Sequence, residues 1–210
     1  AWSLAEELVE EARTTKDSTS EQSDALVLWA SDTVRDEGVM IAFGMKLLGV
    51  RPVWNSRGIV KGLERLPAGP GTDTLSRRNV VFTTSGLFRD LYESQLDQAL
   101  SVLPVDMRKP GEESLSTNGV AAHWVADTRV LLAAGASARD AGAKAAYRVF
   151  GTAPGAYGAG VNRLATRTGA WQDREQLGDA YRRRMGHVYG KGSQGEPAHD
   201  AFDRQLQTVN

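Results

Sequence analysis

The sequence Asn-Val-Val-Phe-Thr-Thr-Ser-Gly at residues 79–86 decides the fold class. Residues 79–83 form a short, mostly apolar run, which is typical of a strand buried on both faces of a sheet. Ser85 and Gly86 then form a turn, and residues 86–103 have the apolar spacing of an amphipathic helix. A buried strand that leads directly into a helix is the repeating unit of a parallel α/β sheet.

The residues before this stretch repeat the same alternation. Residues 25–29 (Ala-Leu-Val-Leu-Trp) predict a buried strand, and residues 37–48 predict a helix that ends at Gly49. Residues 51–54 predict a further strand. We therefore expect these two strands and strand 79–83 to be neighbours in one mostly parallel sheet with flanking helices.

The chain changes character near residue 105. The predicted helices of the second part cover residues 116–135, 137–150 and 174–185. A glycine-rich segment at residues 151–160 separates the last two helices. We therefore expect an α/β part over residues 1–105, which begins with a helix and linker at 1–24, and a mainly helical part over residues 106–210.

Composition excludes several classes of function. The 210 residues include 25 basic and 26 acidic side chains, and a formal net charge of −1 argues against a nucleic-acid partner. Cysteine is absent from the sequence, which excludes disulfides and cysteine-ligated metal sites. No apolar run is long enough to form a transmembrane segment and no signal-peptide pattern is present, so we expect a cytoplasmic protein. A phosphate-binding G-x-x-x-x-G-K-[ST] motif is also missing, so we expect no ATP to be bound here.

The end of strand 79–83 carries the first candidate site. Ser85, Arg89 and Asp90 follow it within two helical turns, and ligands of parallel sheets gather at the carboxyl ends of strands. One interpretation is structural: Ser85 caps the helix, and Arg89 pairs with Asp90 or with a neighbouring helix. The other is a loop that binds an anion or a carboxylate.

The second candidate site is the sequence Gly-Ala-Tyr-Gly-Ala-Gly-Val-Asn at residues 155–162. Its three glycines allow the backbone to approach a flat partner closely, and Tyr157 supplies an aromatic face. A tight connection between two helices is the alternative.

Residues 148–161 (Arg-Val-Phe-Gly-Thr-Ala-Pro-Gly-Ala-Tyr-Gly-Ala-Gly-Val) resemble a segment near the C-terminus of the large subunits of ATP-dependent tetrapyrrole metal chelatases. This family comprises the cobaltochelatase large subunit and the porphyrin-binding subunit of magnesium chelatase. Further blocks that agree in order are residues 49–54, 84–91 and 118–123, then Trp171 with Gln176, Leu177 and Tyr181, and residues 189–190. The resemblance extends from about residue 25 to residue 190.

The resemblance implies that this chain is a C-terminal piece of a much larger subunit. That subunit would bind the tetrapyrrole and form nitrogen–metal bonds, with a divalent ion, Co²⁺ or Mg²⁺, as substrate and with ATP used by separate ATPase subunits. The Pro-Gly-Ala-Tyr-Gly-Ala-Gly form at residues 154–160 resembles cobaltochelatases, so we expect Co²⁺ insertion into a cobyrinic acid-type macrocycle. The alternatives are magnesium insertion into protoporphyrin IX for chlorophyll synthesis, and a non-catalytic scaffold piece that docks the ATPase subunits.

The chemistry of metal insertion indicates which side chains to consider. The macrocycle must lose two pyrrole protons, which requires a base, and cationic groups would hold its carboxylate side chains. The candidates for the base, or for oxygen and imidazole ligands that pass the ion on, are His123, Asp90 and Glu113. The candidates for substrate binding are Arg89, Arg148, Tyr157 and Ser85. The resemblance assigns no metal ligand to a position of this sequence.

The position of His123 discriminates between a tetrapyrrole-binding site and a non-catalytic scaffold. His123 lies four residues before Asp127 on one face of a predicted helix. A histidine at such a position acts either in the site or only in the packing of the helix. If the loops after Trp29, Trp54 and Thr83 converge with His123 on one cavity, a binding site is favoured. A dispersed arrangement favours the scaffold.

Overall fold

A computed structural model describes residues 1–15, 22–66, 77–91, 115, 117–167, 169–190 and 192–209. In chain order its elements are α1 (Trp2–Thr15), β1 (Ser23–Leu28), α2 (Ala30–Arg35), α3 (Val39–Leu47), β2 (Val50–Trp54), β3 (Val60–Arg65), β4 (Asn79–Thr84), α5 (Gly119–Ala133), α6 (Ala138–Lys144), β5 (Val149–Gly151), α7 (Val161–Ala165), α8 (Arg174–Met185), β6 (His187–Gly190), β7 (Ser193–Pro197) and α9 (His199–Leu206). Residues 86–91 are also helical. The rest of the helix expected over 86–103 lies outside the described residues.

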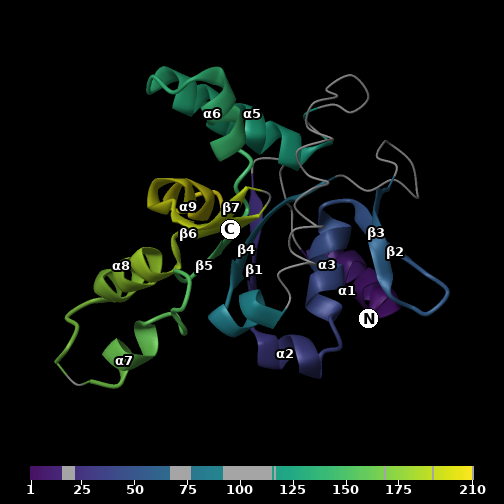
Figure 1. Cartoon of the computed structure of the whole chain (residues 1–210), viewed down its shortest axis with the longest axis horizontal. Coiled ribbons are helices and arrows are strands. Elements are labelled where there is room, and N and C mark those ends of the chain that lie inside the picture. Colours follow the sequence, from purple (N-terminus) through teal and green to yellow (C-terminus); the bar gives the residue numbers. More distant parts are fainter. Residues whose placement is uncertain are drawn as a thin grey trace.

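The centre of the molecule is a five-stranded sheet in the order β1-β4-β5-β6-β7, with helices packed around it (Figure 1). The strands β1, β4 and β5 are parallel, and β6 and β7 are antiparallel to their neighbours. The predicted α/β class with a mostly parallel sheet is therefore confirmed.

Strand β4 is buried on both faces, as its apolar run predicts. Val80 and Val81 are both 0% exposed. Successive side chains of a strand point to opposite faces, so Val80 packs with Leu26 and Leu47 while Val81 packs with Phe150 and other residues of the second cluster. The sheet thus separates two apolar cores, and each fully buried side chain of this kind contributes about 1.5–3 kcal/mol.

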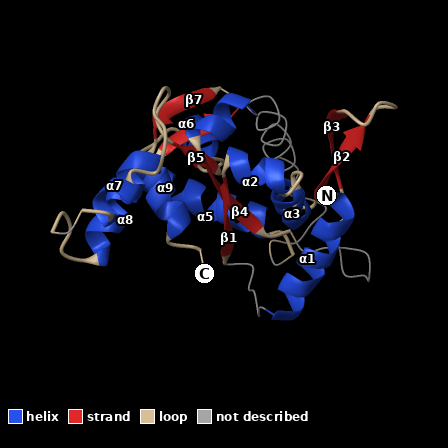
Figure 2. Ribbon diagram, turned by 90° about the horizontal axis from the view of Figure 1, so that it is seen from below, coloured by secondary structure: helices blue, strands red, loops and turns tan. Residues whose placement is uncertain are grey.

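The expectation that residues 51–54 join the central sheet is wrong. The strand β2 pairs antiparallel with β3 in a separate two-stranded sheet, which projects from one side of the molecule (Figure 2). The cause is local. The Asn55 side chain accepts hydrogen bonds from the N–H groups of Arg57 and Ile59 at 2.9 and 3.0 Å and so stabilises a tight turn. This turn returns the chain along β2 before it can cross back to the central sheet.

The expectation of a mainly helical part after residue 105 is also incomplete. The strands β5, β6 and β7 all come from this part and join β1 and β4 in one sheet. The helix predicted over 137–150 ends as α6 at Lys144, and β5 begins at Val149. The sheet therefore crosses the boundary that we expected near residue 105.

Two further predictions of local structure are confirmed. The Ser137 side chain caps α6 by accepting a hydrogen bond from the N–H of Asp140. The helix α8 has the predicted bounds of 174–185. Among the described residues, no helix combines the length and the apolar character needed to cross a membrane.

Candidate functional site

The site lies where the three parallel strands end together. Leu28 of β1 is in register with Thr84 of β4, and Thr84 is in register with Gly151 of β5. Each strand is followed by a segment at this carboxyl edge: α2 after β1, the helix 86–91 after β4, and the glycine-rich loop 152–160 after β5. The loop after Trp54 is absent from this edge because it belongs to the β2–β3 hairpin.

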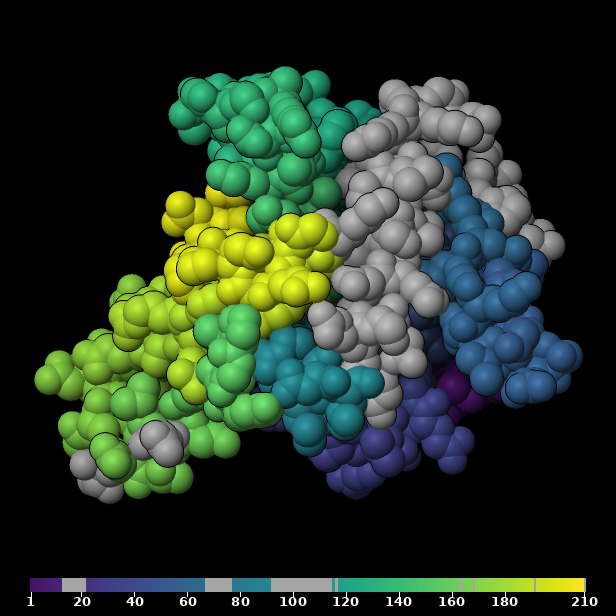
Figure 3. Space-filling model, viewed as in Figure 1, coloured from purple at the N-terminus to yellow at the C-terminus, as the bar shows by residue number. Residues whose placement is uncertain are grey.

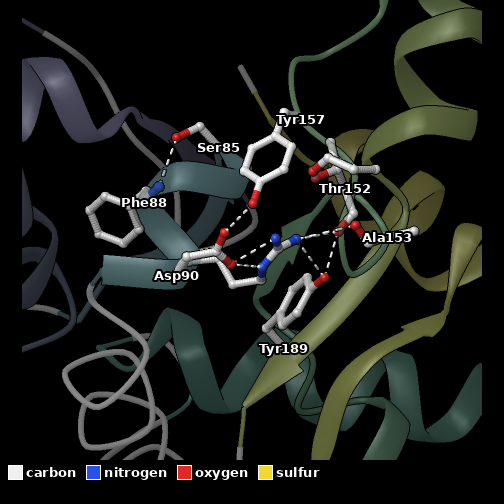
Figure 4. Close-up of polar contacts among 9 residues, drawn as sticks. Ser85, Phe88, Asp90, Thr152, Ala153, Tyr157 and Tyr189 are labelled. Atoms are coloured by element: carbon white, nitrogen blue, oxygen red, sulfur yellow. Dashed lines mark hydrogen bonds and ion pairs between the residues drawn. The ribbon is translucent and has the colours of Figure 1, made fainter.

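Ser85 begins the helix that follows β4. Its Oγ accepts a hydrogen bond from the N–H of Phe88 at 3.0 Å, and the residue is 5% exposed (Figure 4). This is the geometry of a helix N-cap. The side chain is therefore occupied by its own helix, in agreement with the structural interpretation of Ser85.

Arg89 is buried at 7% exposure and binds other parts of this chain. Its Nη1 donates to the carbonyl oxygens of Thr152 and Ala153 and to the hydroxyl of Tyr189, each at 3.2 Å. Its Nε and Nη2 pair with the Asp90 carboxylate at 2.8 and 2.7 Å. The guanidinium thus ties the helix after β4 to the loop after β5.

Asp90 and Tyr157 form the exposed part of the site. The Tyr157 hydroxyl donates to Asp90 Oδ2 at 2.7 Å, and the tyrosine is 58% exposed (Figure 4). This hydrogen bond, together with the Arg89 guanidinium, lowers the pKa of the Asp90 carboxyl below its ordinary value of 3.8. The same bond raises the pKa of Tyr157. Asp90 is therefore an anion at neutral pH, and Tyr157 keeps its proton.

The glycine-rich loop lies against the helix because Gly86 has no side chain. A Cβ at Gly86 would lie 2.5 Å from the carbonyl oxygen of Ala156 and 2.9 Å from Cδ1 of Tyr157. Within the loop, Thr152 Oγ1 donates to the same Ala156 oxygen at 2.6 Å. Arg184 of α8 donates to the carbonyl oxygen of Tyr157 at 3.2 Å from the other side. The loop that carries Tyr157 is thus held between the helix after β4 and α8. Figure 3 shows the first of these contacts, where the loop packs against the helix after β4.

Arg148 lies away from this exposed edge. It is 1% exposed, and it donates to Asn79 Oδ1 at 2.6 Å and to the carbonyl oxygens of Ala145 and Tyr147 at 2.8 Å. Burial lowers its pKa to about 10, and the charge of Asp127 partly offsets this effect. This placement favours a role in joining β4 to β5 rather than in substrate binding.

His123 lies near the opposite end of β4. The helix α5 starts beside the amino end of β4, because the N–H of Gly119 donates to the Arg77 carbonyl oxygen at 2.8 Å. His123 follows one turn later and is 8% exposed. From Asn79 to Thr84, β4 spans roughly 16 Å. Figure 1 shows the same separation, with α5 at the top and the helix 86–91 (teal) at the bottom.

The contacts of Asp127 also place this part of α5 at the amino edge of the sheet, away from Asp90. Asp127, one turn beyond His123, accepts a hydrogen bond from Gln205 at 2.5 Å, and Gln205 lies 3.4 Å from the Asn79 amide. Asp127 and Gln205 therefore belong to a partly buried polar network at the amino edge of the sheet, and His123 lies on the same helix one turn before Asp127. Of the candidate bases, Asp90 stands at the carboxyl edge, His123 does not, and Glu113 lies outside the described residues.

Sequence reasoning missed two residues of the site. Tyr189 of β6 is 8% exposed, and its hydroxyl donates to the Thr152 carbonyl oxygen at 2.5 Å. Thr152 is 1% exposed. Their only sequence signal was their position in the blocks at 148–161 and 189–190. Among the described residues, no group of three or more histidine, aspartate or glutamate side chains is arranged to hold a metal ion.

Comparisons with known proteins place this geometry in a family. The family model described as CobN/Magnesium Chelatase matches residues 1–210. The aerobic cobaltochelatase subunit CobN of a Sinorhizobium species is 34% identical over 194 residues, which cover 89% of this chain and 14% of that protein. A magnesium-chelatase subunit of Cereibacter sphaeroides is 31% identical over 191 residues, 89% of this chain and 15% of that protein.

A solved structure agrees with these matches. The catalytic subunit of cobaltochelatase from Mycobacterium tuberculosis superposes with a TM-score of 0.80 and 29% sequence identity, over 99% of this chain and 16% of that chain. The chain thus spans only about 14–16% of the length of these relatives. Since the family model covers the full chain and two curated relatives exceed 30% identity, this protein belongs to the CobN/magnesium chelatase family.

Proposed function

We propose that the chain is part of the tetrapyrrole-binding large subunit of an ATP-dependent metal chelatase. The names of its relatives, cobaltochelatase and magnesium chelatase, support this assignment. In this role the divalent metal ion is a substrate. ATP is bound by separate ATPase subunits of the same complex.

The exposed pair Asp90 and Tyr157 is the main reason to propose that this chain contacts the tetrapyrrole. The Tyr157 ring is exposed and presents an aromatic surface on which a flat macrocycle can stack. Leu87 and Leu91, one turn apart on the helix that bears Asp90, are 51% and 61% exposed and add apolar surface. An aromatic ring, an apolar helix face and a carboxylate at one edge suit a tetrapyrrole that must meet a metal cation.

The low pKa of Asp90 defines its part in the reaction. A carboxylate that binds protons weakly is a poor general base for a pyrrole N–H. Carboxylate oxygens are, however, ligands that divalent cations accept, and Asp90 Oδ2 becomes free for the ion when the hydroxyl of the exposed Tyr157 is displaced. Asp90 therefore attracts and hands on the metal ion, while proton removal falls to a group outside this edge.

Cobalt is the metal that we propose first. The support is the sequence at residues 154–160, which resembles the cobaltochelatase form. The macrocycle would then be of the cobyrinic acid type. Magnesium insertion into protoporphyrin IX remains the alternative.

A scaffold role is the second candidate, and one observation favours it. His123 and Arg148 are buried at the amino edge, away from Asp90 and Tyr157, so the expected groups do not converge on one cavity. In this case the chain would hold neighbouring parts of the subunit or dock the ATPase subunits without touching the macrocycle.

The two roles are separated by variants of the full-length large subunit, assayed with its ATPase partners. Asp90→Asn should slow metal insertion about tenfold or more, because one charge-assisted contact contributes about 1.5–3 kcal/mol. Tyr157→Ala should weaken tetrapyrrole binding about three- to tenfold, since an aromatic pair contributes about 0.5–1.5 kcal/mol. Insertion is followed by the visible absorption of the macrocycle.

The control and the metal assignment use the same assay. Asp140→Asn replaces an exposed carboxylate on α6 and should leave the rate of metal insertion and the affinity for the tetrapyrrole unchanged. Co²⁺ with a metal-free cobyrinic acid derivative is compared with Mg²⁺ and protoporphyrin IX. Wild-type binding and insertion in both site variants would support the scaffold role instead.

A further inference from the structure

Tyr189 connects three segments that are far apart in sequence. It lies in β6, and its hydroxyl donates to the Thr152 carbonyl oxygen at 2.5 Å and accepts from Arg89 Nη1 at 3.2 Å. Burial raises the pKa of Tyr189, so the phenol keeps the proton that it donates. One side chain thus joins β6, the start of the glycine-rich loop and the helix after β4 (Figure 4).

The Arg89 guanidinium transmits this contact to the exposed pair. It lies 5.6 Å from the ring centroid of Tyr189 and 5.9 Å from that of Tyr157, both within the range of a cation–π contact. It also pairs with Asp90, which accepts the Tyr157 hydroxyl. From Tyr189, a continuous series of contacts therefore reaches both exposed groups of the proposed substrate surface.

The backbone around Tyr189 leaves it little freedom. A Cβ at Gly195 of β7 would lie 2.8 Å from the Tyr189 hydroxyl and 2.5 Å from Cδ of Pro154 in the loop. The hydroxyl and the loop are thus packed directly against the β7 backbone. This close packing restricts the position of the hydroxyl and of the loop carbonyl that it binds.

We propose that Tyr189 is a positioning residue for substrate binding: through Thr152 and Arg89 it fixes the glycine-rich loop so that Tyr157 faces the macrocycle. This inference rests on the proposed function. Tyr189 itself is buried and makes no contact with substrate. We therefore expect its effect on binding of the metal-free macrocycle to pass through the exposed group that stacks on the ring, Tyr157.

The test is a double-mutant cycle in the full-length large subunit. Binding of protoporphyrin IX and of a metal-free cobyrinic acid derivative is measured by absorption and by quenching of tryptophan fluorescence. Tyr189→Phe removes the hydroxyl and keeps the ring, and it should weaken binding about three- to tenfold, the effect of one or two hydrogen bonds. In a Tyr157→Ala background, the same substitution should cause no further loss.

Two variants complete the design. Tyr181→Phe is the matched control, because it removes a hydroxyl that bonds Thr83 of the same sheet at 3.2 Å. It should leave binding unchanged. Thr152→Val removes the Oγ1 bond to Ala156 inside the loop and should reproduce the Tyr189→Phe result, which keeps the test open if Tyr189→Phe does not fold.

The outcomes separate this inference from the proposed function. If the unaltered subunit binds neither macrocycle, or if Tyr157→Ala binds as tightly as the wild type, the proposed function fails and the inference with it. If Tyr157→Ala weakens binding but a folded Tyr189→Phe variant does not, only the positioning role is overturned, whatever the result for Thr152→Val. Equal losses in both backgrounds would also overturn it, because a general loss of stability adds independently of Tyr157.

Discussion

Arg89 shows at the residue scale how a cation expected to bind substrate can instead bind its own chain. A guanidinium has five N–H donors in a planar fork. Here they are directed to the Asp90 carboxylate, the Tyr189 hydroxyl and two backbone carbonyls, of Thr152 and Ala153. A substrate carboxylate would have to displace these groups from a side chain that is only 7% exposed.

Replacement of Arg89 should therefore change stability. In Arg89→Lys, a single ammonium cannot reproduce the planar fork, and hydrogen bonds to charged groups contribute about 1.5–3 kcal/mol. We expect the free energy of unfolding to fall by about that amount in urea denaturation. The exposed Arg129 of α5 provides the control, since Arg129→Lys should change stability by less than about 0.5 kcal/mol. An Arg89→Lys variant as stable as the wild type would contradict this structural role.

Asp90 gives a prediction for pH dependence. Its pKa is lowered in the folded state, chiefly by the Tyr157 hydrogen bond and then by Arg89. A depressed pKa contributes stability above the unfolded value of 3.8, and this contribution is lost as the pH falls through the folded value. In Tyr157→Phe the pKa should rise toward 3.8, as measured by NMR titration of the Asp90 carboxyl carbon. An unchanged titration curve would contradict the assigned hydrogen bond.

At the scale of elements, the contact between the helix 86–91 and the glycine-rich loop depends on Gly86. Gly86→Ala should destabilise the chain by about 1–3 kcal/mol, because the added methyl group would overlap a backbone carbonyl that cannot move aside cheaply. Gly178→Ala is the control. It adds a methyl group to α8 with its nearest neighbour at 3.8 Å, and should stabilise by about 0.5–1 kcal/mol. Urea denaturation of both variants checks this; equal stability gains would refute close packing at Gly86.

Local signals in the sequence predicted those elements that local forces determine. The buried strand β4, the Ser137 cap and the helix α8 each follow from neighbouring residues. The expected place of β2 in the central sheet was wrong because the apolar residues at 51–54 do not specify a partner strand, and the Asn55 turn pairs β2 with β3 instead. The strand β5 has three residues, which is too few for a periodic pattern.

The same limit applies to the site. Ser85, Arg89 and Asp90 follow β4 directly, so the carboxyl-edge rule located them. Helical spacing placed His123 and Asp127 on one face of α5. The spacing of residues within a helix does not show which end of β4 the helix packs against, so the position of His123 at the amino edge could not be predicted. Tyr189 was missed because its role depends on the pairing of β6 with β5.

The whole molecule has one central sheet, built from both sides of residue 105. We therefore expect one cooperative unfolding transition rather than two. Variants that keep only Trp29, from the first part, or only Trp124, from the second, would report each part by fluorescence. Their urea midpoints should coincide. Two separate midpoints would indicate that the parts before and after residue 105 fold independently.

The pairing of β4 with β5 has a practical consequence for division of the chain. The strands β1 and β4 come from residues before 92, and β5, β6 and β7 come from residues after 114. They meet along the parallel pairs Phe82–Val149, Thr83–Phe150 and Thr84–Gly151. A chain cut between these segments would give two polypeptides, each with an open strand edge that only the other completes. Produced together, the two fragments should reassemble by strand complementation, so that the Asp90–Tyr157 pair forms only when both are present.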